Sequence, residues 1–182
     1  MEQNVVQPLR IQQATRLELE ECLILCDTGI KHNSGDIHRD QRQQMSQGKV
    51  RKLVETNVQL CYSMRNNLLR GQLNQFGKSL DQAWQLKRQF SSKISSVHID
   101  RICEGAKQHG ATGGKLLGAG GGGFLLFYVD TKNKTLNLQI YLRSADVFLA
   151  NNWNACTGAL FVHLLCNLKD INLTPGTLSL VC

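Results

Sequence analysis

The chain contains two short, continuous apolar runs. In its longer segments, apolar residues instead recur with helical spacing. The first run, at 22–26, ends in Asp27-Thr28-Gly29, and the second, at 124–129, follows a series of glycines. A short apolar run bounded by turn-forming residues is typical of a buried strand. The pattern therefore predicts strands at about 22–27 and 123–129.

The segment between these strands is predicted to be helical over most of its length. Apolar residues follow 3.6-residue spacing over 36–70 and again over 73–84, and each stripe is typical of a buried helix face. Gly48 can interrupt the helical pattern of 36–70, and Gly71 is suited to end the helix. A third helix is expected after Ser96, a good N-cap residue, with its end near Gly110.

The two ends of the chain have weaker patterns. Residues 1–18 are mostly polar, and Pro8 argues against one continuous helix there. Residues 136–182 hold only four charged residues in 47, whereas 1–135 hold the other 31 of 35. Apolar residues alternate with polar ones at 136–142 as in a strand, and no convincing amphipathic helix follows. We therefore expect a domain at 1–135 and a divergent tail at 136–182.

Composition and charge limit the classes of protein without choosing between them. The 182 residues are 42% hydrophobic and 19% charged, which is the balance of a globular protein with one core and not of a disordered chain. The net charge of +7 suits a phosphorylated metabolite, nucleic acid or simply a solubilising surface. Charge alone does not separate these three alternatives.

The seven cysteines show no CxxC pair and no Cys/His spacing that would build a zinc site, so we predict no metal site. The sequence starts without a signal peptide, and no apolar run approaches the ~20 residues that span a bilayer. We therefore expect a soluble protein of the reducing cytoplasm with no membrane partner.

The most informative stretch is 113–130, where seven of eighteen residues are glycine and the last part is apolar. Glycine loses the most backbone entropy on folding, so this run is costly unless the backbone turns tightly or approaches something closely. A flexible linker is the usual alternative, but linkers have polar flanks and this loop has apolar ones. Because N–H groups in such a loop can surround an anion, the stretch is a candidate phosphate site.

The sequence context excludes two familiar phosphate-binding loops. The glycines at 118–123 match the letters GxGxxG, but a dinucleotide fingerprint opens a helix, and here a strand follows. A Walker loop ends in Gly-Lys followed by Ser or Thr, whereas Gly114-Lys115 precedes the glycine run and is followed by Leu116.

A third kind of loop matches both in its letters and in its setting. The helix from Ile99, then Gly110-Ala111, Gly113-Gly114-Lys115 and Gly118-Ala119-Gly120-Gly121-Gly122-Gly123, resembles the third conserved motif of the GHMP kinases, which phosphorylate small metabolites with ATP. Further matches stand in the right order at 8–11, 23–30 and 97–102. Over about residues 5–130 the chain is most similar to bacterial sugar kinases of the D-glycero-D-manno-heptose 7-phosphate type.

The resemblance implies an α+β fold, that of a GHMP kinase C-terminal domain. This domain is ferredoxin-like, with a small antiparallel or mixed sheet covered by the helices of 36–110, and it is expected to be incomplete here. The resemblance also implies that the chain lacks the N-terminal half, which carries the ATP phosphate loop and the catalytic side chains. The tail at 136–182 does not match the family's own ending.

The candidate site residues also come from the resemblance. The loop of Gly118, Ala119, Gly120, Gly121, Gly122 and Gly123 would face the phosphates of ATP. Lys115 would lie beside it, although a solvated flank is an equally good interpretation of this lysine. Thr28, Gly29 and Ser34 would line the acceptor pocket. We assign no catalytic residue and no metal ligand to this chain, and ATP and Mg²⁺ belong to the complete kinase.

The expected function is therefore the C-terminal part of an ATP-dependent kinase for a sugar or sugar phosphate, inactive without its N-terminal half. The alternative is a non-catalytic basic module that binds nucleic acid. Such a module stacks bases on aromatic side chains, and this chain has only 6% aromatic residues, most of them in predicted core stripes. The sequence identifies neither the sugar and its accepting hydroxyl nor the oligomeric state.

Overall fold

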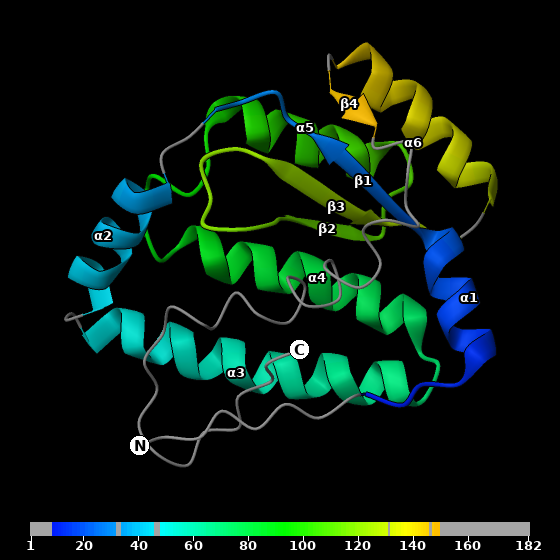
Figure 1. The fold of residues 1–182 in the computed structure, drawn as a ribbon, viewed down its shortest axis with the longest axis horizontal. Coiled ribbons are helices and arrows are strands. Elements are labelled where there is room, and N and C mark those ends of the chain that lie inside the picture. The colour runs from blue at the N-terminus through cyan, green and yellow to red at the C-terminus, as the bar shows by residue number, and fades with distance from the viewer. Residues whose placement is uncertain (1–8, 32–33, 46–47, 131, 146, 150–182) are drawn as a thin grey trace.

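The computed structural model describes residues 9–149, except 32–33, 46–47, 131 and 146. In this part of the chain, six helices and four strands form an α+β fold, as expected (Figure 1). In chain order the elements are α1 (Gln13–Cys22), β1 (Leu23–Asp27), α2 (Ser34–Met45), α3 (Gly48–Leu69), α4 (Leu73–Arg88), α5 (Val97–Gln108), β2 (Gly113–Leu116), β3 (Phe124–Tyr128), α6 (Lys132–Ser144) and β4 (Phe148–Leu149).

The strands form one antiparallel sheet in the order β2-β3-β1-β4. The central strands β1 and β3 pair from Leu23 opposite Tyr128 to Asp27 opposite Phe124. They are the two apolar runs of the sequence. Both runs are continuously apolar because side chains on both faces of these strands are buried.

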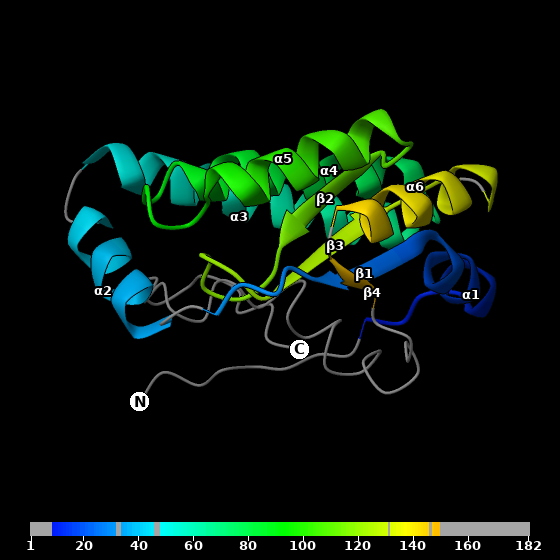
Figure 2. The same ribbon diagram turned by 90° about the horizontal axis from the view of Figure 1, so that it is seen from above.

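Alternate residues of the central strands point to opposite faces of the sheet. One set joins buried side chains of α1, α3 and α4 on what we call the α3/α4 face; its members are Leu23, Leu25, Leu126 and Tyr128. The other set joins buried side chains of α5 and α6 on the α5/α6 face; its members are Ile24, Cys26, Leu125 and Phe127. The sheet thus has an apolar cluster on each side, and α1 and α2 lie at its opposite ends (Figure 2).

Most of the helices and both predicted strands are confirmed. The apolar stripes at 36–70 and 73–84 correspond to α2, α3 and α4, and α3 begins at Gly48. Gly71 follows α3 with a φ angle of 67°, as a C-terminal stop requires. Ser96 is the N-cap of α5, where its hydroxyl oxygen accepts a hydrogen bond from Ile99 N.

Two of the missed elements, α1 and β2, have weak local patterns. Helix α1 buries only Thr15 and Leu19 and exposes Leu17, so its apolar stripe is too narrow to recognise in a polar segment. Strand β2 contains Gly113 and Gly114, which have no side chain to mark a buried strand. Both elements are fixed by packing against the rest of the fold.

The strand expected at 136–142 is wrong, because these residues lie in helix α6. Leu138 and Leu142 are fully buried, whereas Leu136 and Ile140 are exposed. Residues four apart lie on the same side of a helix, so the alternation fits two opposite helix faces as well as a strand. Packing of Leu138 and Leu142 into the cluster on the α5/α6 face selects the helix.

The expected boundary between residues 135 and 136 falls inside α6. The part of the expected tail up to Leu149 contributes Leu138, Leu142 and Val147 to the buried cluster, and β4 pairs with β1. The larger part of that tail, residues 150–182, lies outside the described residues. The divergent tail therefore stays a prediction.

Candidate functional site

The glycine-rich stretch forms the turn of the hairpin between β2 and β3. Leu117 N donates a hydrogen bond to Phe124 O at 2.8 Å and closes the base of the loop. Residues with a Cβ rarely adopt positive φ angles. Four loop residues have them, at 70°, 122°, 75° and 90° for Gly118, Gly120, Gly121 and Gly123. The path of the backbone therefore requires the glycines.

Side chains from two helices hold the first half of the loop. Lys87 of α4, which is only 8% exposed, donates from Nζ to Gly118 O. Gln41 of α2 donates from Nε2 to Ala119 O at 3.2 Å. The loop lies at the same end of the molecule as α2 (Figure 1), so these two donors reach it from separate elements.

Backbone groups hold the second half of the loop. Gly121 N donates to Ile94 O at 2.8 Å, and Thr28 N donates to Gly123 O at 2.9 Å. A Cβ on Gly120 would lie 2.9 Å from Ile94 Cα, so the loop backbone packs directly on the segment before α5. The loop is anchored along its length, and the alternative of a flexible linker is wrong.

These anchors have an electrostatic consequence. The carbonyl oxygens of Gly118, Ala119 and Gly123 all accept hydrogen bonds from protein donors. A carbonyl oxygen is the negative end of the peptide dipole and repels an anion, whereas the N–H end attracts one. These three oxygens are directed onto the protein and therefore away from an anion at the loop, and phosphate binding by the loop stays a prediction.

Lys115 lies on β2, three residues before Gly118. It pairs with Leu126 and is 5% exposed, so its side chain belongs to the α3/α4 face. Burial lowers the pKa of its ammonium group, and the nearby Cys61 thiol of α3 acts in the opposite direction. The interpretation of Lys115 as a solvated flank is therefore wrong, and its contact with phosphate stays a prediction.

The three residues suggested for the acceptor pocket differ in how the structure places them. Thr28 is buried, and its hydroxyl oxygen accepts a hydrogen bond from Ile30 N at 3.3 Å. Gly29 is exposed, has a φ angle of 68° and donates to Asp27 Oδ1 at 3.0 Å. Ser34 begins α2, and its side chain lies outside the described residues. The bond from Thr28 N to the loop brings this turn beside the glycines, and its role in binding stays a prediction.

Sequence reasoning missed the two side-chain anchors of the loop. Lys87 continues the buried stripe of α4 three residues after Trp84, and a lysine at that position signals a partner for its charge. Gln41 gives no such signal, because it lies 78 residues before the oxygen that it binds.

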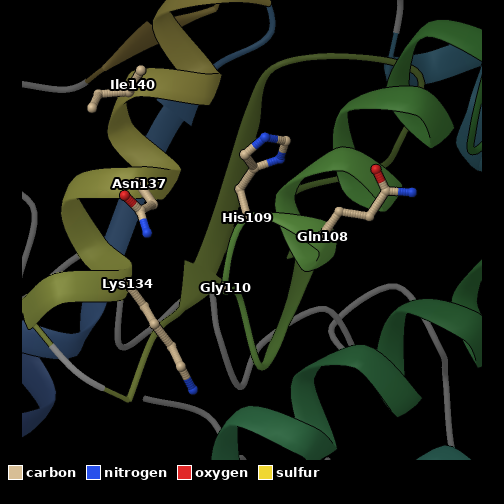
Figure 3. A pocket seen from close by; sticks show the side chains of 6 residues that line it. All are labelled: Gln108, His109, Gly110, Lys134, Asn137 and Ile140. Carbon is tan, nitrogen blue, oxygen red and sulfur yellow. The ribbon is translucent and has the colours of Figure 1, made fainter.

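A pocket of about 390 Å³ opens between the end of α5 and α6 (Figure 3). Its lining residues are Gln108, His109, Gly110, Lys134, Asn137 and Ile140. The His109 ring stacks on Tyr141 with 4.4 Å between centroids, and Lys134 Nζ pairs with Asp130 at 3.0 Å. Because Gly110 precedes β2 and the glycine loop follows it, this pocket lies at the other end of the hairpin from the candidate site.

Within the described ranges, no group of three or more His, Cys, Asp or Glu side chains is placed to hold a metal ion. No helix in the same ranges is both long and apolar enough to cross a membrane.

Two family models match this sequence. The model described as GHMP kinases C terminal matches residues 64–141, which run from the second half of α3 into α6 and include the glycine loop. A second model, described as thymidylate synthase, matches residues 123–181. It overlaps the first over 123–141, and more than half of its span lies beyond the described residues.

The names of two curated relatives each include a kinase activity. The D-glycero-alpha-D-manno-heptose 7-phosphate kinase of Campylobacter jejuni is 31% identical over 130 residues, which cover 71% of this chain and 38% of the relative. The bifunctional fucokinase/GDP-fucose pyrophosphorylase of Arabidopsis thaliana is 27% identical over 164 residues, covering 82% of this chain and 15% of the relative. This chain therefore spans well under half the length of either protein.

A solved structure shows the same fold. Mevalonate kinase of L. major, in complex with R-mevalonate, superposes with a TM-score of 0.68 at 21% identity, over 79% of this chain and 43% of that protein. The described residues therefore have the fold of the C-terminal domain of the GHMP kinases, and the chain carries the sequence pattern of that family from α3 to α6.

Proposed function

We propose that this chain forms the C-terminal part of an ATP-dependent kinase that phosphorylates a sugar or a sugar phosphate. The names of both curated relatives include a sugar kinase activity. The observation that carries the proposal is the anchored glycine loop, whose carbonyl oxygens at Gly118, Ala119 and Gly123 are bound by protein donors. Its N–H groups are thereby favoured for contact with phosphate.

Phosphoryl transfer depends mainly on positioning and on neutralising the charge of the phosphates. The loop at 118–123 supplies rigid N–H dipoles for this purpose without any ionised side chain of its own. Lys115, three residues before Gly118, would add a positive charge on the buried side of the hairpin. ATP supplies the phosphoryl group and Mg²⁺ neutralises its oxygens in the complete kinase. We assign no ligand of that ion to the described residues.

We assign no catalytic base to this chain, and we propose that it is inactive alone and requires an N-terminal kinase half. The test is a chimera in which residues 9–149 take the place of the matching region of the Campylobacter jejuni kinase. The assay is ADP formation that depends on D-glycero-D-manno-heptose 7-phosphate. We expect turnover by the chimera and none by the isolated chain. A folded chimera without turnover would contradict the kinase proposal, and turnover by the isolated chain would contradict its incompleteness.

A pair of variants tests whether the loop faces phosphate. Gly118 has a φ angle of 70°, and a Cβ built there meets nothing within 4 Å. Asp and Asn both tolerate this region of φ and have the same shape, so Gly118→Asp and Gly118→Asn differ only in charge. We expect the KM for ATP of the chimera to be about 10- to 100-fold higher with Asp than with Asn, because a like charge near phosphate costs a few kcal/mol. Equal KM values would refute the phosphate contact.

A further inference from the structure

Three side chains form a row across the end of the sheet next to the glycine loop. Asp27 at the end of β1 lies opposite Phe124 of β3 and also opposite Phe148 of β4. Directly opposite residues of antiparallel strands point to the same face of the sheet. The row therefore reads Phe124, Asp27, Phe148, with the carboxylate between two aromatic side chains.

The two rings of this row are exposed, at 44% for Phe124 and 71% for Phe148. They lie on the α3/α4 face, where the next cross-strand pair of that face, Leu25 of β1 opposite Leu126 of β3, is buried under helices. The helices on this face therefore cover the sheet as far as the Leu25–Leu126 pair and leave the aromatic side chains of the row exposed. Exposed apolar side chains that gather at one place on a surface mark a candidate binding site.

The turn after β1 fixes the middle of the row. Asp27 Oδ1 accepts a hydrogen bond from Gly29 N at 3.0 Å, which orients the carboxylate. A Cβ on Gly29 would lie 3.9 Å from Phe148 Cε2, so the ring of Phe148 leans over this turn. Thr28 N donates to Gly123 O at 2.9 Å, which joins the same turn to the end of the glycine loop.

We propose that Phe124, Asp27 and Phe148 form a subsite for the ring of the acceptor sugar, an inference that rests on the proposed function. Neighbouring strands lie about 4.8 Å apart, so the two aromatic side chains start roughly 10 Å from each other. This spacing leaves room for one sugar ring in van der Waals contact with both rings. The Asp27 carboxylate only accepts hydrogen bonds, and so it binds sugar hydroxyls between them.

The same row discriminates between classes of acceptor. R-mevalonate, the ligand of the structural relative, is a carboxylic acid and has no sugar ring. Its carboxylate would meet the like charge of Asp27, and its open chain offers no ring face to the two phenylalanines. The row therefore favours a neutral pyranose over an organic acid.

The test is a titration of the 15N-labelled full-length chain with D-mannose, and in parallel with R-mevalonate, followed by NMR of the backbone amides. We expect D-mannose to shift the amides of Asp27, Gly29, Phe124 and Phe148, and R-mevalonate to leave them unchanged. Phe148→Ala should weaken mannose binding at least about fivefold, since loss of an aromatic contact costs about 1 kcal/mol. Asp27→Asn keeps the oxygen that Gly29 N binds but should weaken mannose binding and admit R-mevalonate.

Val97→Ala is the control, because Val97 is also a highly exposed apolar residue (78%) but lies at the start of α5. It should leave mannose binding unchanged. The subsite is refuted if mannose shifts no amide of the row, or if Phe148→Ala and Val97→Ala bind mannose alike. The titration contains no ATP, so an inactive chimera together with normal mannose binding overturns the proposed function and supports the subsite. An active chimera whose KM for the sugar phosphate is unchanged by Phe148→Ala overturns the subsite alone.

Discussion

Helix α4 packs closely on strand β2 where Gly77 meets Gly113, and this contact makes a sharp stability prediction. A Cβ built on Gly113 of β2 would lie 2.1 Å from Gly77 O of α4 and 3.1 Å from Asp81 N. Both neighbours are backbone atoms, so neither can rotate away. In Gly113→Ala, the helix has to move from the strand by roughly 1.3 Å to restore an ordinary contact distance.

The expected cost of Gly113→Ala follows from this displacement. Overpacking of a closely packed contact costs about 1–3 kcal/mol, and a clash with backbone on both sides belongs at the upper end of that range. A loss of about 3 kcal/mol lowers the thermal midpoint by roughly 6–12 °C in a chain of this size. It lowers the urea midpoint by about 1–2 M if the slope is near 2 kcal/mol per M.

The assay is urea unfolding of the full-length chain followed by far-UV circular dichroism. Gly118→Ala is the control for loss of glycine itself: it meets no atom within 4 Å and has only the strain of a φ angle of 70°. That strain costs about 1–2 kcal/mol. An unfolding midpoint for Gly113→Ala that equals or exceeds that of Gly118→Ala would show that α4 and β2 are not in the contact described.

Two further predictions concern α5 and the sheet core. Ser96→Ala removes the hydrogen bond that Ile99 N donates to the Ser96 hydroxyl. It should lower the free energy of unfolding by about 1 kcal/mol. Ser92 is exposed, and an equal loss of stability in Ser92→Ala would contradict this prediction. Burial raises the pKa of Cys26 and of Cys103 from 9.0 to about 12. These thiols ionise first in the unfolded chain, so stability that is complete below pH 9 should fall toward pH 12 by up to about 1.4 kcal/mol per pH unit for each. Parallel pH curves for wild type and for Cys26→Ala/Cys103→Ala would exclude this origin.

The sequence predicted those parts of the fold whose signals are local. The apolar runs of β1 and β3, the stop at Gly71 and the cap at Ser96 each depend on residues close together in the chain. Strand β2 could not be found in this way. Gly113 and Gly114 are glycines because Gly77 O and the ring of Phe127 occupy the space of their Cβ atoms, and those neighbours are brought there only by the fold.

The candidate site likewise has a part that the sequence predicted and a part that only the fold brings together. The glycine loop was recognisable because a glycine run between apolar segments is rare and costly. The groups that determine its shape were not recognisable, since Lys87 and Gln41 lie 31 and 78 residues from the oxygens that they bind. The row at the end of the sheet was hidden as well, because Asp27, Phe124 and Phe148 become neighbours only through the strand register.

Because the glycine loop is anchored by groups outside the hairpin, its sequence alone does not determine its conformation. A peptide of the hairpin alone would contain every glycine but none of the donors from α2, α4 and the turn after β1. Without these donors, the conformation with four positive φ angles would be one of many that the peptide adopts, because glycine has more accessible backbone conformations than any other residue. Grafting the loop in its observed conformation onto another scaffold would require transfer of Lys87, Gln41 and the Ile94 carbonyl along with it.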